Sequence, residues 1–173
     1  MDVGAARPDL NVLGLEIRDP VVEKALRVRD ERGLRNVHFV ACSANANIDQ
    51  VLEAVQRYSR VERVLIQMPD PWFKRRHHNR RVTTPQLLRS IAGALPPDGR
   101  LFVQSDVLDV AAQMRRELEA CARLQDLTEP EGEVFEAKGH AWLCVNPNGF
   151  STERERYVLN QDLPVYRALY GRK

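Results

Sequence analysis

The chain has 173 residues, 43% of them hydrophobic and 29% charged, which is enough for one folded domain. Lysine and arginine number 26 against 24 acidic residues, so the formal net charge of +2 points to no class of partner. No apolar run reaches the roughly 18–20 residues that cross a bilayer, and no signal peptide is recognisable, so we expect a soluble protein without membrane contact. Three widely spaced cysteines predict neither a disulfide framework nor a zinc knuckle.

Strands and helices alternate through the first two thirds of the sequence. The hydrophobic pattern predicts strands over residues 11–16, 37–41, 61–68 and 101–103. It predicts helices over residues 20–33, 48–58, 84–95 and 107–122. Thr84 is a good N-cap for the third of these helices, because Pro85 suits the first helical position. Such alternation favours a parallel sheet covered by helices on both faces.

The last third of the sequence has a different pattern. Residues 128–139 are acidic and are predicted to form a loop or a weakly ordered insertion. Residues 151–159 and 165–170 are predicted as two strands of a closing antiparallel hairpin, although the first of them is strongly charged.

Polar side chains follow four of the predicted strands: Glu16, Asn45, Asp70 and Asp106. Ligands of open α/β sheets bind beyond the carboxyl ends of the strands, so these residues are the first candidates for a site. Glu16 suits a ribose, because a carboxylate at such a strand end accepts hydrogen bonds from both hydroxyls. The alternative is that each side chain only caps the following helix, and for Asp106 this is about as plausible as a function.

The segment from Pro69 to Arg81 is the most unusual in the chain. Pro69 and Pro71 restrict the backbone on both sides of Asp70. Five basic residues follow without an acidic one: Lys74, Arg75, Arg76, Arg80 and Arg81. A solvated face or a localisation signal is the usual explanation for a basic run, but its attachment to a fixed carboxylate at a strand end favours contact with a polyphosphate backbone.

Four separated segments together resemble the tRNA (guanine-N7-)-methyltransferases that use S-adenosyl-L-methionine: residues 11–18, 69–81, 102–114 and 146–155. The resemblance is to bacterial and to plant and algal plastid-type members, so we expect an intracellular protein of the cytoplasm or a plastid. It implies an α/β fold, the Rossmann-like class I methyltransferase fold, with three layers, a mostly parallel sheet and a C-terminal antiparallel hairpin. Residues 1–173 would form a single, N-terminally incomplete methyltransferase domain.

The resemblance also implies roles for individual residues. Asp70 would be the active-site acid beside the cofactor. The other cofactor-binding residues would be Asp2, Gly4, Glu16 and Asn45. The substrate-binding residues would be Lys74, Asp106, Thr152 and Glu155. The RNA backbone would be held by Arg75, Arg76, Arg80 and Arg81. The implied partner is tRNA, with no metal, and the chain would act as a monomer or with an unidentified partner subunit.

The sequence departs from the family at its glycine-rich cofactor loop. Asp2-Val3-Gly4 matches only the beginning of that loop, and Ala5 follows directly. Either the chain is an incomplete version of a longer protein, which we favour, or it is a non-catalytic RNA-binding relative that has lost the cofactor loop. In both cases we expect these 173 residues to bind S-adenosyl-L-methionine poorly.

The chemistry of guanine is consistent with these residue types. Its N7 atom has a free lone pair, so methylation needs orientation at close approach rather than a general base. Its N1–H and exocyclic amine are neighbouring donors that a carboxylate such as Asp70, Asp106 or Glu155 can bind together. Trp72 and Phe73 either stack on an extruded base or pack under the loop. A nicotinamide-dependent oxidoreductase is disfavoured, because no Gly-x-Gly-x-x-Gly motif is present.

Overall fold

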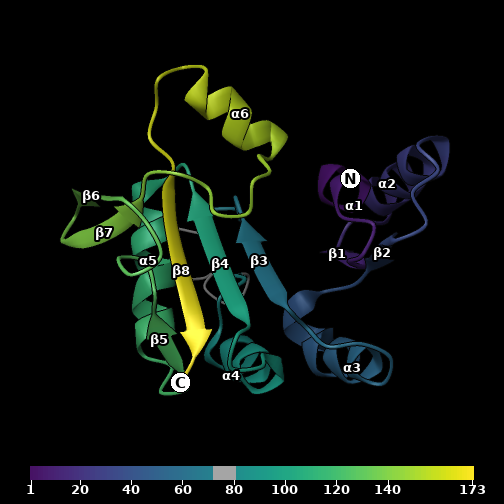
Figure 1. The fold of residues 1–173 in the computed structure, drawn as a ribbon, viewed down its shortest axis with the longest axis horizontal. Coiled ribbons are helices and arrows are strands. Elements are labelled where there is room, and N and C mark those ends of the chain that lie inside the picture. The colour runs from purple at the N-terminus through teal and green to yellow at the C-terminus, as the bar shows by residue number, and fades with distance from the viewer. Residues whose placement is uncertain (72–80) are drawn as a thin grey trace. The chain divides into compact units, whose positions relative to one another are not determined.

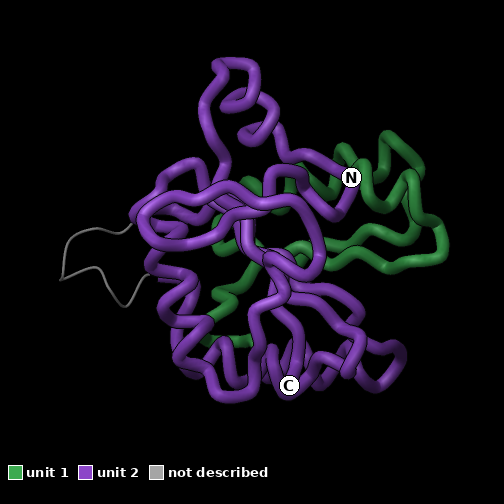
Figure 2. Tube along the Cα trace, turned by 60° about the vertical axis from the view of Figure 1, so that its left-hand side comes forward, with its two compact units in different colours: residues 1–48 green, residues 49–173 purple. Residues whose placement is uncertain are grey.

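The computed structural model describes residues 1–71 and 81–173. These residues form two compact units, residues 1–48 and residues 49–173, shown in different colours in Figure 2. Within the described ranges, no helix combines the length and the apolar character needed to span a membrane.

The first unit is built around two parallel strands. Its elements are α1 (Asp2–Ala6), β1 (Val12–Glu16), α2 (Asp19–Glu31), β2 (Val37–Ala41) and the first residues of α3 (Ala44–Gln56). Strands β1 and β2 pair in register from Val12 opposite Val37 to Glu16 opposite Ala41. The side-chain amide of Asn36 donates to the carbonyls of Gly4 and Leu10, at 2.9 and 2.8 Å. These hydrogen bonds connect α1 and the segment after it to the residue that precedes β2.

Residues 2–6 correct one expectation. They form the helix α1, in which Gly4 is buried, and not a turn after a strand. A Cβ atom on Gly4 would lie 2.1 Å from Cγ2 of Val37, so this glycine permits close packing against β2. Asp2 lies in the first turn and pairs with Arg32 at 3.0 Å. Residues 2–6 are therefore helical where the start of a glycine-rich loop is expected, and a cofactor-binding role for Asp2 and Gly4 stays a prediction.

The second unit contains a four-stranded sheet in the order β3-β4-β8-β5 (Figure 1). Its strands are β3 (Arg63–Gln67), β4 (Arg100–Ser105), β5 (Leu124–Asp126) and β8 (Tyr166–Arg172). Strands β3 and β4 are parallel, whereas β8 runs antiparallel to both β4 and β5. Helices α4 (Pro85–Ala94) and α5 (Leu108–Glu119) follow β3 and β4, and α6 (Glu153–Leu159) precedes β8.

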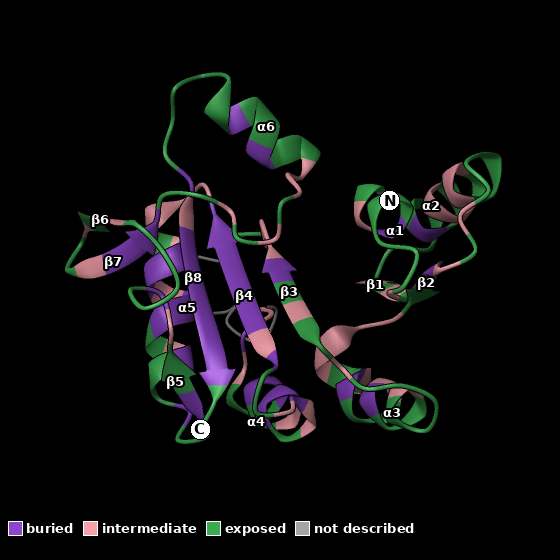
Figure 3. Ribbon diagram, in the orientation of Figure 1, coloured by how far each residue is buried: buried purple, intermediate pink, exposed green. Residues whose placement is uncertain are grey.

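The core of this unit lies on both sides of β4 and β8, which are almost entirely buried (Figure 3). A hairpin of β6 (Val134–Ala137) and β7 (His140–Leu143) contributes Leu143, which clusters with Phe102 and Leu169. Helix α5 packs against β4, β5 and β8. Because neighbouring side chains on a strand point to opposite faces, Gln104 and its cross-strand partner Arg167 share the face of Phe102 and Leu169.

A buried arginine organises the packing of α5. The guanidinium of Arg115 pairs with Asp126 and donates to the carbonyl of Ala141 at 2.5 Å. It also lies 5.4 Å from the ring of Trp142, a favourable cation–π distance. Burial raises the pKa of the neighbouring Tyr170 hydroxyl far above its ordinary value. These contacts join α5 to β5 and to β7, beside Tyr170 of β8.

The structure confirms the α/β fold and most predicted elements of the first two thirds. Thr84 caps α4 as expected, accepting a hydrogen bond from the amide of Leu87 at 3.3 Å. Antiparallel pairing is present towards the C-terminus, in the β6–β7 hairpin and in β8. Two details are wrong: residues 153–159 are the helix α6 and not a strand, and the expected loop over residues 128–139 contains β6.

Candidate active site

In the first unit, Glu16 and Asn45 follow two adjacent parallel strands. Glu16 is the last residue of β1, and its carbonyl accepts a hydrogen bond from the amide of Cys42 at 2.9 Å. Asn45 lies three residues further along, in the first turn of α3, and is half-buried. Since the carboxyl ends of parallel strands lie at the same edge, the structure brings both predicted residues to one place.

Arg18 controls the charge of the Glu16 carboxylate. It donates to that carboxylate from its backbone amide at 3.0 Å and from its Nε at 2.9 Å. The hydrogen bond from the Arg18 side chain is the main reason why the pKa of Glu16 lies below its ordinary value, and burial acts in the opposite direction. The Glu16 side chain is 28% exposed. It is therefore an ionised acceptor that a ligand at this edge can reach.

In the second unit, Asp70 and Asp106 follow the parallel strands β3 and β4. The amide of Met68 still bonds to the carbonyl of Gln104, at 2.9 Å, which keeps the two strand ends side by side. Met68 has a φ of 49°, a conformation that costs energy in a residue with a side chain and that turns the chain out of β3 before Pro69. Asp70 is exposed and Asp106 half-buried at this edge.

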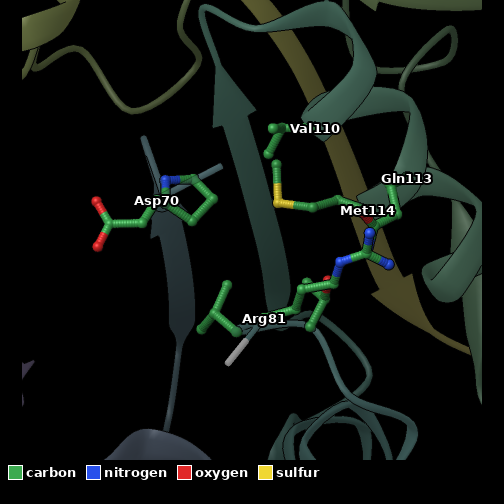
Figure 4. A pocket seen from close by; sticks show the side chains of 8 residues that line it. Asp70, Arg81, Val110, Gln113 and Met114 are labelled. Carbon is green, nitrogen blue, oxygen red and sulfur yellow. The ribbon is translucent and has the colours of Figure 1, made fainter. Parts of the chain in front are cut away.

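A small hollow lies beside Asp70, with about 300 Å³ of empty volume including its open mouth. Its walls come from the two ends of the basic segment and from α5: Pro69, Asp70, Arg81, Val82, Thr83, Val110, Gln113 and Met114. Figure 4 shows the Asp70 carboxylate turned away from Val110, Gln113 and Met114. The acid therefore stands at the rim of the hollow.

Asp106 forms an ion pair with Arg154, a residue for which no motif predicts a role. Nε and Nη2 of Arg154, in α6, both donate to Oδ2 of Asp106, at 3.0 and 2.5 Å. The Asp106 side chain is 15% exposed and that of Arg154 is 55% exposed. Asp106 is thus held in one orientation by a guanidinium, whose paired N–H groups resemble the donor pair on guanine.

Thr152 and Glu155 form a capping box at the start of α6. The hydroxyl of Thr152 accepts from the amide of Glu155 at 3.0 Å, and the Glu155 carboxylate accepts from the amide of Thr152 at 3.3 Å. Glu155 is fully buried, in contrast to Asp70. The Ser/Thr-x-x-Glu spacing is a recognised sign of a helix start, so the sequence did contain the signal for this helix.

Much of the predicted RNA-binding segment lies outside the described residues. This applies to Trp72, Phe73, Lys74, Arg75, Arg76 and Arg80, whereas Arg81 is described and lines the hollow beside Asp70. Within residues 1–71 and 81–173, no group of three or more His, Cys, Asp or Glu side chains could hold a metal ion.

Comparison with known proteins identifies the family. A family model described as "Putative methyltransferase" matches residues 1–168. A tRNA (guanine-N(7)-)-methyltransferase of Prochlorococcus marinus strain MIT 9313 is 43% identical over 99% of this chain and 74% of its own length. Proteins with the same name from Synechococcus elongatus and Thermosynechococcus vestitus are 42% and 40% identical over 99% of the chain and 75% and 74% of their own lengths. The chain belongs to the tRNA (guanine-N7-)-methyltransferase family.

Solved structures support the fold of this methyltransferase. A precorrin-6y C5,15-methyltransferase of Geobacter metallireducens matches 95% of the chain and 68% of its own, with a TM-score of 0.54 and 14% identity. An rRNA methylase of Streptococcus thermophilus matches 94% of the chain and 73% of its own, with a TM-score of 0.51 and 8% identity. At such low identity the likeness concerns the fold alone, which agrees with the α/β architecture.

Proposed function

We propose that the protein is a tRNA (guanine-N7-)-methyltransferase that transfers a methyl group from S-adenosyl-L-methionine to N7 of a guanine in tRNA. The observation that carries this proposal is the 40–43% identity to the cyanobacterial enzymes of that name over 99% of the chain. The polar edge of each unit supports it, because Glu16 and Asn45 in one and Asp70 and Asp106 in the other follow the carboxyl ends of parallel strands.

The edge of β1 and β2 fits the nucleoside part of S-adenosyl-L-methionine. The ionised Glu16 can accept hydrogen bonds from both ribose hydroxyls, and the amide of Asn45 has the donor and acceptor groups that an adenine edge needs. Residues 2–6 are helical and form no glycine-rich turn, so they are not part of this proposal.

The remaining work of the enzyme is to orient the guanine. S-adenosyl-L-methionine, when bound, supplies an electrophilic methyl group on a sulfonium. The N7 lone pair of guanine is free, so no side chain has to remove a proton before the transfer. Asp70 and Asp106 are carboxylates that can accept from the N1–H and the exocyclic amine of the base and so present N7. In this proposal Asp70 and Asp106 recognise the substrate, and the basic segment with Lys74, Arg75, Arg76, Arg80 and Arg81 holds the RNA backbone.

The proposal is tested by methylation of unmodified tRNA. The protein is incubated with a tRNA transcript and labelled S-adenosyl-L-methionine, and N7-methylguanine is located by reduction and aniline cleavage. We expect cleavage at a guanine, and a loss of roughly 10- to 100-fold in kcat/KM for Asp70→Asn and for Asp106→Asn, because each removes a charged hydrogen-bond acceptor.

Asp98→Asn is the matched control. Asp98 is an exposed acid that pairs with Arg60 just before β4 begins, at the opposite end of that strand from Asp106. This variant should keep the activity of the unmodified protein. Labelling of an exocyclic amine instead of N7, or equal activity in all three variants, would contradict the proposal.

A further inference from the structure

The carboxylate of Glu155 is the most completely enclosed acidic group described in the protein. Its side chain is 1% exposed, and that of its partner Arg167 is 5% exposed. Oε1 accepts from Nε and Nη2 of Arg167 at 3.0 and 2.9 Å. Oε2 accepts from Nε2 of Gln104 at 3.2 Å and from the amide of Thr152 at 3.3 Å. The side-chain amide of Asn146 lies within 3.2 Å of both oxygens.

These donors leave the carboxylate no capacity for a substrate. A carboxylate offers about four lone-pair positions, and Glu155 already faces six donor contacts. A guanine that took the place of Arg167 would leave a buried cation without its anion, which is strongly unfavourable. Glu155 therefore differs from Asp70 and Asp106, which lie at the edge of the sheet with part of their surface open.

The same contacts bring four separate segments together. Gln104 lies near the end of β4, and Arg167 lies opposite it in β8. Nη1 of Arg167 also donates to the carbonyl of Cys144 at 3.0 Å, and Asn146 accepts from the amide of Asn148 at 3.0 Å. Glu155 itself is held at the first turn of α6 by the capping box. The pair thus fixes the start of α6 against the ends of two core strands.

Arg154 links the position of α6 to the orientation of Asp106. It is the residue before Glu155, and its guanidinium points to the carboxylate at the end of β4. Resting on the function proposed above, we propose that Glu155 and Arg167 are a positioning pair: they fix α6 so that Arg154 orients Asp106, and Glu155 does not contact the substrate base. This role differs from the substrate-binding role that the resemblance implies for Glu155.

A charge-neutral double variant tests this proposal. Glu155→Gln alone leaves the buried Arg167 charge without its partner, so we expect a lower urea midpoint and a loss of methylation. Glu155→Gln with Arg167→Gln removes both charges and lets two amides bond to each other. We expect its urea midpoint to rise above that of Glu155→Gln, and its kcat/KM to return to within about threefold of the unmodified protein. A double variant with a restored urea midpoint and the activity loss of Asp106→Asn would overturn the proposal.

Arg154→Gln tests whether Arg154 orients Asp106. This test remains valid if the Glu155→Gln, Arg167→Gln double variant fails to fold. This side chain is more than half exposed, so we expect an unchanged urea midpoint with a higher KM for tRNA, and partial recovery in Arg154→Lys. Full activity in Arg154→Gln would overturn the proposal.

An NMR measurement tests the positioning pair independently of the proposed methyltransferase function. The Nε–H signal of Arg154, assigned by its loss in Arg154→Gln, should be weakened in Glu155→Gln and restored in the double variant. An inactive unmodified protein that shows this pattern would refute the methyltransferase function and leave the positioning pair intact. If the enzyme is active but the Arg154 Nε–H signal is the same in Glu155→Gln as in the unmodified protein, the positioning pair is refuted.

Discussion

At the scale of single residues, the positions of the strand ends predicted where the three acids lie but not which arginines they contact. Glu16, Asp70 and Asp106 all lie at carboxyl ends of strands, as predicted from where each apolar run stops. Arg154 forms an ion pair with Asp106, which lies 48 residues earlier in the sequence. Arg167 in β8 forms an ion pair with Glu155 in α6. No spacing in the sequence indicates such pairs, because they depend on how β8 returns beside β4.

The Arg18–Glu16 pair makes a prediction about pH. Because Arg18 lowers the pKa of Glu16, the pair stabilises the fold above the ordinary glutamate pKa, and this contribution is lost as the pH falls through the lowered value. Arg18→Gln should move the Glu16 pKa back up towards its ordinary value, as measured by carbon NMR titration of the carboxyl group. Arg29→Gln, which breaks a pair with Asp30 elsewhere in the first unit, is the control and should leave Glu16 unchanged.

At the scale of elements, the errors have identifiable causes. Residues 151–159 are predicted as a strand, although the spacing of Thr152 and Glu155 indicates the helix start that the structure shows. The β6–β7 hairpin turns at Lys138 and Gly139, both with positive φ. Such a turn is usually marked by Asn-Gly or Asp-Gly, so Lys-Gly in an acidic segment gave little signal.

The cap of α6 makes a prediction about stability. Thr152→Ala removes the side-chain acceptor of the capping box and should lower the free energy of unfolding by about 1 kcal/mol, measured by urea denaturation. Thr152→Ser keeps the hydroxyl and should stay within a few tenths of a kcal/mol of the unmodified protein. Thr84→Ala provides a second reference, since the Thr84 hydroxyl caps α4 by accepting from the amide of Leu87. Equal stability of Thr152→Ala and Thr152→Ser would show that the cap contributes nothing.

At the scale of the whole molecule, the net charge of +2 conceals an uneven distribution. Five basic residues lie between positions 74 and 81 without an acid among them, and an RNA partner is the reason proposed for this density. The alternation of apolar runs was sufficient to predict the α/β class. It was not sufficient to place β8 between β4 and β5, because the order of strands in a sheet depends on long-range packing.

The basic segment makes a prediction about salt. Replacing Lys74, Arg75 and Arg76 together by glutamine should weaken tRNA binding and reduce the slope of log K against log salt by about 2, since each lost phosphate contact removes roughly 0.7–0.9 from it. The control replaces Lys24, Arg27 and Arg35, three exposed basic residues of the first unit, and so changes the net charge equally. Fluorescence anisotropy over a range of salt concentrations measures both. Identical slopes for the two variants would argue against a phosphate-binding role.

The position of β8 also determines when the second unit can fold during synthesis. Strand β8 comprises Tyr166–Arg172, yet it hydrogen-bonds to β4 on one side and to β5 on the other. A nascent chain that ends before residue 166 therefore leaves the backbone groups of β4 unpaired on that side and lacks Arg167, the only cation that Glu155 contacts among the described residues. The sheet of this unit can therefore close only once residues 166–172 have emerged from the ribosome, and β4 stays partly unpaired until then.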